Sequence, residues 1–162
     1  MMKSTAPDLF YNIVEERLFG SLDSKNFDAH AVSGGRAGSK TPGAVNQVLA
    51  NNPFLTDVKL GAGHPGGPLP MALYTLSCHE TRPNWIRLNP DDPLDLGDRA
   101  GFAIHGRGQR GSDGCIVPFD FNVVLRLYTL TRARAVAGRP APSLQVFATG
   151  DLGRFEKMAR LA

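Results

Sequence analysis

The sequence predicts a single, mostly β domain with a few helices, an α+β fold class. A chain of 162 residues is long enough for one domain with a substantial hydrophobic core. Its 42% hydrophobic and 20% charged residues are an ordinary balance for a globular protein. Glycine (18 residues) and proline (12 residues) exceed their typical combined usage of about 12% and follow no repeat. This excess indicates many turns between short strands.

Alternating apolar and polar residues, bounded by turn-forming residues, predict six short strands. In chain order they cover residues 14–19, 27–33, 71–78, 85–88, 102–104 and 144–148. The first two flank a turn at 23–26 whose residues suit a hairpin. Residues 61–70 are rich in glycine and proline, so this stretch is expected to be irregular.

One substantial helix is predicted over residues 119–135, where Phe121, Val124 and Tyr128 recur at helical spacing. One or two further helical turns are expected within 44–51. There is no internal repeat and no sign of a second domain. We therefore divide the chain into a lead-in (1–12), one domain (13–150) and a C-terminal tail or short helix (151–162).

Composition excludes several classes of protein. The formal charge is only +3, and the basic residues are scattered rather than gathered in a stripe with aromatic residues, so nucleic-acid binding is not expected. No run approaches the roughly 18 to 20 apolar residues that a membrane span needs. The N-terminus lacks the apolar run of a secretory signal, which predicts synthesis as a soluble cytoplasmic chain. Cys78 and Cys115 either pair or remain free thiols; two cysteines do not make a disulfide framework.

The most informative segment is 104–116, which reads IHGRGQRGSDGCI. It places Cys115 ten positions after His105, with four glycines and two arginines between Ile104 and Cys115. A thiol attacks carbonyls as a thiolate, which imidazole or cationic groups stabilise. Glycines let the backbone turn so that its N–H groups can point at a developing oxyanion. The pattern predicts a cysteine acyl-transfer site; the alternative is a partly buried thiol near an unrelated histidine.

A zinc site is the chemical rival to that interpretation. Cys78, His79, His105 and Cys115 would supply the four ligands, but they lack the paired spacing of known zinc motifs. Neighbouring Cys78 and His79 on a strand would also point to opposite faces. No metal and no other cofactor is therefore expected.

The motif resembles the active-site signature of the L,D-transpeptidases, the YkuD-like superfamily: a histidine, a gap, then Ser/Thr-His-Gly-Cys. The short gap and the Ser-x-Gly-Cys form at 112–115 are most similar to the type VI secretion effectors of this superfamily, which attack peptidoglycan. Residues 31–35 resemble its Ser-Gly segment, and 67–70, followed by Tyr74, resemble its Gly-Pro-Ile-Pro turn. The resemblance implies a YkuD-like β-sandwich with a helix following the nucleophile.

Two positions depart from the family pattern. Asp113 stands where the broader transpeptidases usually carry a second histidine, which leaves His105 as the only histidine within the motif. This departure counts against ordinary cross-linking activity. Ala72 replaces a glycine that often follows the turn, a change expected to matter only structurally.

The resemblance also implies a mechanism and a set of site residues. Cys115, as a thiolate paired with His105, would attack the third stem-peptide residue at its bond to D-alanine, and His105 would protonate the leaving amine. Backbone N–H groups around Gly114 and Cys115 would stabilise the oxyanion. Ser112 would fix the turn or hydrogen-bond the imidazole. The candidate substrate-binding residues are Arg107, Arg110, Asp113 and Tyr74.

The implied function is that of a cysteine L,D-carboxypeptidase or L,D-transpeptidase acting on peptidoglycan stem peptides through a thioacyl-enzyme. As an antibacterial effector it would be carried by a type VI secretion apparatus to the periplasm of a target bacterium. A cognate immunity protein would protect the producing cell. Two alternatives stay open: a cysteine peptidase or amidase acting on another substrate, and a catalytically silent module that binds cell wall.

Overall fold

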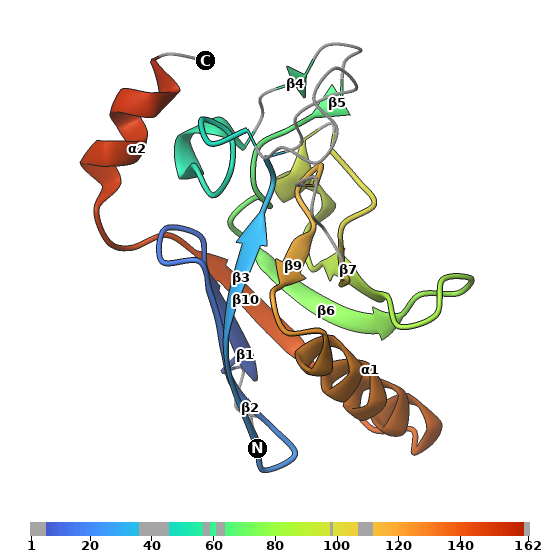
Figure 1. Cartoon of the computed structure of the whole chain (residues 1–162). Coiled ribbons are helices and arrows are strands. Elements are labelled where there is room, and N and C mark those ends of the chain that lie inside the picture. Colours follow the sequence, from blue (N-terminus) through green and yellow to red (C-terminus); the bar gives the residue numbers. More distant parts are fainter. Residues whose placement is uncertain are drawn as a thin grey trace.

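The computed structural model describes residues 6–35, 46–56, 59–60, 64–97, 99–106 and 112–160. Eight strands within these segments close into a barrel (Figure 1). In the order in which they hydrogen-bond, they are β1 (Leu9–Asn12), β10 (Ser143–Phe147), β6 (Leu73–Cys78), β7 (Ile86–Pro90), β8 (Ala103–Ile104), β9 (Ile116–Pro118), β3 (Lys25–Ser33) and β2 (Arg17–Leu22). The short strands β4 (Lys59–Leu60) and β5 (His64–Pro65) pair separately.

The barrel is mixed, because two of its neighbouring pairs are parallel. β1 runs parallel to β10 and antiparallel to β2, and β8 runs parallel to β9. Each of the eight strands has two neighbours, so the sheet closes on itself. The expected YkuD-like β-sandwich is therefore wrong: the structure is a closed, mostly β barrel with two short α-helices among its described residues. Strands of sandwiches and barrels alternate inward and outward residues alike, so the sequence pattern did not separate the two.

The N-terminal strands differ most from the sequence-based expectation. β1 lies inside the stretch predicted to be a lead-in and pairs on both sides. Asp23 and Ser24 both have positive φ (49° and 65°) and form a tight two-residue turn between β2 and β3. The turn is shorter than predicted, which extends both strands toward it.

The two helices pack on different parts of the barrel. α1 (Phe121–Val136) begins at the N-cap Asp120, whose side chain accepts a hydrogen bond from the N–H of Asn122. It buries Val124 and Leu127 and contacts β6, β7 and β9. α2 (Leu152–Ala159) packs beside the 3-10 turn η1 (Pro53–Leu55), while a second 3-10 turn, η2 (Pro93–Leu96), follows β7. None of these helices is long and apolar enough to cross a membrane.

A buried polar network joins the barrel to the segment that precedes η1. The Tyr11 hydroxyl donates to the Ala31 carbonyl (2.8 Å) and accepts from the Asn51 side chain (2.8 Å). The same Asn51 amide group accepts from the Ser33 N–H (3.0 Å). Buried polar groups are costly unless they are paired, and these pair with one another. The network fixes the end of β3, which borders the candidate site.

Candidate active site

The ladder between β8 and β9 places His105 and Cys115 on one face of the barrel. Ile104 and Ile116 are direct partners and are fully buried, so they point inward. The neighbouring residues therefore point outward, because side chains alternate along a strand. The His105 N–H continues the ladder by donating to the Ile116 carbonyl (3.1 Å). His105 thus directly follows one partner of this pairing, and Cys115 directly precedes the other.

Ser112 holds the turn that presents the cysteine. Its Oγ donates to the Cys115 carbonyl (2.9 Å) and accepts from the N–H groups of Gly34 (3.1 Å) and Gly114 (3.4 Å). Of the two roles considered for this serine, the structure shows the turn-fixing one. Gly114 itself has a φ of +121°, a conformation that other residues rarely adopt.

The three segments that carry the family resemblance meet at this turn. The fully buried Ser33 Oγ donates to the Gly114 carbonyl (2.9 Å) and accepts from the Leu69 N–H (2.9 Å). A Cβ added to Gly34 would lie 2.5 Å from the carbonyl carbon of Gly67, so these two backbones touch. The Ser-Gly segment, the Gly-Pro-Leu-Pro turn and the cysteine turn thus form one packed unit.

One backbone N–H beside the thiol has no acceptor among the described residues. The Gly114 N–H is already directed at Ser112 Oγ. Among the described residues, no acceptor pairs with the Cys115 N–H. An unpaired N–H on the nucleophile's own residue is a suitable donor for an oxyanion that forms on the attacked carbonyl. The geometry thus favours Cys115 over Gly114 as the oxyanion donor.

Trp85, which sequence reasoning did not single out, packs on the candidate base. Its ring lies parallel to the His105 imidazole, with centroids 4.1 Å apart and planes 9° apart. The two residues face each other because Ile86 pairs with Ile104 one position away. The sequence shows only that Trp85 stands at the start of a predicted strand. Its contact with His105 follows from the pairing of β7 with β8, which the sequence does not reveal.

The hydrogen bonding of His105 defines its tautomer. Its Nδ1 lies 3.2 Å from the Gly106 carbonyl oxygen, which can only accept a hydrogen bond. The proton of a neutral imidazole therefore resides on Nδ1, and Nε2 remains a free base. This is the arrangement that a general base requires.

Burial favours the neutral forms of both reactive groups. Desolvation raises the pKa of the Cys115 thiol above its ordinary 9.0, opposed by a backbone hydrogen bond from Ala103 and by the nearby Arg82 and Arg99. Desolvation also lowers the pKa of His105 below its ordinary 6.5, although the Gly106 carbonyl opposes the shift. Both shifts favour the neutral thiol and the neutral imidazole over the thiolate ion pair expected from the sequence.

Among the described residues, the arginines that lower the pKa of the thiol are Arg82 and Arg99. Arg107 and Arg110, expected to grip substrate, lie outside the described residues. Arg82 stands in the loop between β6 and β7, its guanidinium 4.3 Å from the centre of the Trp85 ring. Arg82 acts on both reactive groups, because it lowers the pKa of Cys115 and of His105.

Tyr74 and Asp113, two further residues predicted to bind substrate, both hydrogen-bond to other parts of the protein. Tyr74 is fully buried and its hydroxyl donates to the Pro70 carbonyl (2.7 Å), so it is a core residue and does not line a cleft as expected. The main-chain carbonyl of Asp113 accepts from Arg99 (2.8 Å), and its carboxylate raises the pKa of Cys115.

Cys78 and Cys115 are both free thiols. Cys78 Sγ lies 4.0 Å from the Tyr128 carbonyl of α1, so this thiol faces the helix. Among the described residues, no three side chains of the metal-ligating types cluster together. Cys78 therefore has a structural environment of its own, apart from the His105 and Cys115 pair.

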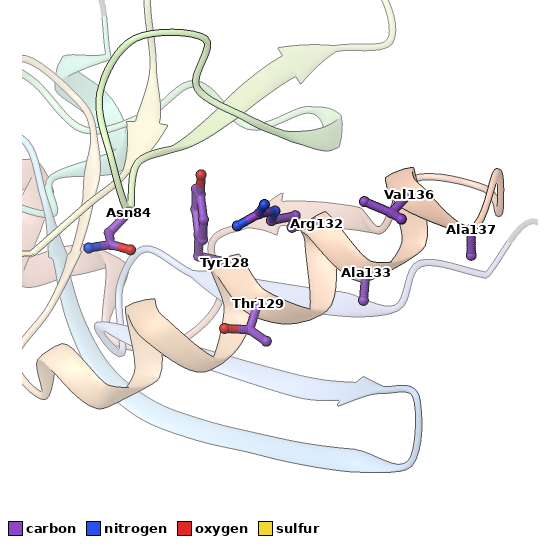
Figure 2. A pocket seen from close by; sticks show the side chains of 7 residues that line it. All are labelled: Asn84, Tyr128, Thr129, Arg132, Ala133, Val136 and Ala137. Carbon is purple, nitrogen blue, oxygen red and sulfur yellow. The ribbon is translucent and has the colours of Figure 1, made fainter.

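A groove of about 560 Å³ lies between α1 and the loop that carries Asn84. Figure 2 shows Tyr128 and Arg132 projecting from α1 toward this loop. Neither His105 nor Cys115 lines it. Its one link to the site along the chain is Asn84, which precedes Trp85.

No known protein family matches this sequence, and no curated protein is significantly similar to it. A barrel of this general kind does not itself specify an activity. The function is therefore argued from the chemistry of the site.

Proposed function

We propose that the protein is a cysteine L,D-carboxypeptidase or L,D-transpeptidase that acts on peptidoglycan stem peptides. The observation that carries the proposal is the convergence of residues 33–34, 67–69 and 112–115. Three segments that were singled out for resemblance to one family's motifs, far apart in the sequence, pack together around one thiol. The proposal rests on this site and not on the barrel.

The arrangement supports a two-stage acyl transfer. As the substrate carbonyl approaches, Cys115 Sγ bonds to its carbon and the thiol proton passes to Nε2 of His105. The carbonyl oxygen becomes an oxyanion that accepts a hydrogen bond from the Cys115 N–H, an interaction worth about 3 kcal/mol. The carbon–nitrogen bond to D-alanine then breaks, and the imidazolium gives its proton to the departing amine.

A thioester between the stem peptide and Cys115 remains after this first stage. His105, neutral again, removes a proton from an incoming water molecule or amine, which attacks the thioester and releases the thiol. Water yields the shortened stem peptide and so L,D-carboxypeptidase activity. A D-amino acid or the amine of another stem yields exchange or a cross-link.

The direct test is incubation of the protein with tetrapeptide muropeptides, with and without a D-amino acid, followed by mass spectrometry. We expect loss of D-alanine, or its replacement by the added D-amino acid. Cys115→Ala should abolish both reactions. Cys78→Ala is the matched control, because that thiol faces α1, and it should retain them. Intact muropeptide, or equal turnover by Cys115→Ala, would refute the proposal.

The two alternatives predict other outcomes. A peptidase or amidase for a different substrate would leave muropeptides intact, but His105→Ala would slow the alkylation of Cys115 by iodoacetamide. In a silent binding module, His105→Ala would leave that rate unchanged. The two rates are compared in a Cys78→Ala background, where Cys115 is the single thiol.

We further propose, on the resemblance of the motif, that this activity serves an antibacterial type VI effector with a cognate immunity protein. Its substrate would then be met in the periplasm of a target cell. Expression of the protein with a periplasmic leader in a Gram-negative host should inhibit growth, while cytoplasmic expression should not. Inhibition that is equal in both compartments, or that survives Cys115→Ala, would contradict this role.

A further inference from the structure

Arg99 is a buried arginine that connects three separate segments around the cysteine turn. It is only 5% exposed. Its Nη1 donates to the carbonyls of Thr56 and Pro68 (2.6 Å to the latter). Its Nη2 donates to the carbonyls of Gly67 (2.9 Å) and Asp113 (2.8 Å). One guanidinium thus ties the end of η1 and the Gly-Pro-Leu-Pro turn to the turn that precedes Cys115.

The surrounding backbone is shaped to admit this side chain. A Cβ added to Gly114 would lie 2.5 Å from Arg99 Nη2 and 2.4 Å from the ring of Phe102. Phe102 in turn lies beneath the guanidinium, 4.9 Å from ring centre to Cζ. A Cβ added to Gly67 would overlap the Leu55 carbonyl oxygen, 1.6 Å away. Any larger residue at either glycine would displace Arg99 or the turns that it holds.

Together with Ser33, Arg99 holds successive carbonyls of the cysteine turn. Arg99 binds the Asp113 carbonyl, and Ser33 Oγ binds the Gly114 carbonyl (2.9 Å). A peptide plane is rigid, so fixing the Gly114 carbonyl also fixes the N–H of Cys115 on the other side of that plane. The donor available for the oxyanion is therefore oriented from outside the site.

Arg99 also contributes charge. It is one of two described arginines that lower the pKa of the Cys115 thiol, and it is the buried one. A buried cation is screened by solvent much less than an exposed one. Its effect on the thiol is therefore expected to persist at physiological salt.

We propose that Arg99 is the positioning residue of the site: it fixes the Asp113–Gly114 peptide, directly before the peptide that carries the Cys115 N–H, and supplies the buried positive charge beside the thiol. The inference rests on the proposed function, because it takes Cys115 as the nucleophile. Part of its test needs no substrate, so the two can fail separately.

The test uses the full chain with Cys78→Ala, which leaves Cys115 as the single thiol. The rate of alkylation by iodoacetamide is measured against pH, and kcat and KM are measured with tetrapeptide muropeptide. Arg99→Met removes the charge and the hydrogen bonds, while Arg99→Lys keeps the charge but lacks the planar fork. Arg134→Met is the matched control, because Arg134 is also largely buried but pairs with Asp23, away from the site.

We expect Arg99→Met to move the alkylation profile to higher pH and to lower kcat by about tenfold or more, with KM changed less than about threefold. Arg99→Lys should keep the wild-type alkylation profile but still lose several-fold in kcat. Arg134→Met should lower the melting temperature and leave both readouts unchanged.

A wild-type profile and kcat in folded Arg99→Met would overturn the inference, as would equal effects of Arg134→Met. If Arg99→Met does not fold, Arg99→Lys decides, because wild-type kcat in that variant contradicts the need for the fork. If wild-type protein leaves muropeptides intact but Arg99→Met shifts the alkylation profile, the proposed substrate is wrong and the electrostatic role of Arg99 stands. Turnover by wild type with no shift in Arg99→Met refutes the role of Arg99 alone.

Discussion

At the scale of single residues, the site is built from neutral groups held in place by their surroundings. His105 is stacked on Trp85 and hydrogen-bonded to the Gly106 carbonyl, which leaves Nε2 as the base. Burial raises the pKa of Cys115 and so favours its protonated form. The thiolate is therefore expected to form during attack, with His105 removing the proton.

This division of roles predicts the pH dependence of activity. His105 must be neutral to act as a base, and its pKa lies below 6.5, so kcat/KM should rise through an acid limb below pH 6.5 and then level off. A mechanism that required a preformed thiolate would instead rise near or above pH 9, because the pKa of Cys115 is raised. Rates of D-alanine release between pH 4.5 and 10 distinguish the two, and a profile that rises only at alkaline pH would contradict the general-base role.

Trp85 should control the position of that acid limb. Trp85→Ala removes the ring that shields the imidazole, so the pKa of His105 should rise toward 6.5 and the acid limb should move up with it. We expect kcat to fall about tenfold as the imidazole loses its fixed orientation. An NMR titration of the His105 ring measures the pKa without substrate. Trp85→Phe, which keeps an aromatic face, is the control and should stay near the wild-type value.

At the scale of elements, the cysteine turn depends on the end of β3. Ser33 is fully buried and bridges the Gly114 carbonyl and the Leu69 N–H. Its neighbour in the network, Asn51, ties the same strand end to Tyr11 in the barrel wall. The turn is thus anchored to the barrel by a chain of buried hydrogen bonds rather than by the short β9 alone.

Removing that anchor should cost stability and activity together. Ser33→Ala leaves a buried carbonyl and a buried N–H without their partner, which should lower the free energy of unfolding by about 1 to 3 kcal/mol. Urea unfolding measures the loss, and muropeptide turnover should fall in parallel because the Gly114 peptide is released. Ser21→Ala, at an exposed position on β2, is the matched control and should be neutral. If Ser33→Ala has the same free energy of unfolding as wild type, the hydrogen bonds of Ser33 do not stabilise the fold.

At the scale of the whole molecule, β1 closes the barrel by pairing with β2 and β10. Its residues Leu9 and Tyr11 are fully buried in the core. Part of the segment predicted to be a lead-in, residues 1–12, is therefore a strand of the barrel.

Removing residues 1–12 should accordingly unfold the protein, because both neighbouring strands would lose a partner and the core would be exposed. We expect loss of the cooperative thermal transition in circular dichroism. A truncated protein that retains a wild-type transition would show that β1 is dispensable.

The sequence predicted local features well and long-range ones poorly. The helix expected at 119–135 is observed at Phe121–Val136, and the strand expected at 71–78 is observed at Leu73–Cys78, because each follows from residues close in the chain. β1 was missed because its partners are far away in the sequence. The closed barrel was missed for the same reason.

The candidate site was predictable only where its residues are contiguous. His105, Ser112 and Cys115 lie in one short segment, so spacing alone pointed to them. Trp85 and Arg99 reach the site through the pairing of β7 with β8 and through loop packing, and neither has a sequence motif. Tyr74 was placed in the site by resemblance, but its strand turns it into the core.

The parallel pairing of β1 with β10 also sets an order of assembly during synthesis. The first barrel strand cannot gain its second neighbour until the ribosome has delivered residues up to Phe147. Contacts between such distant parts of a chain form slowly, because the intervening loop must close first. The strands on either side of Cys115, β8 and β9, emerge from the ribosome earlier, but the barrel to which they belong closes only when β10 pairs with β1. A growing chain therefore carries Cys115 well before its barrel can close.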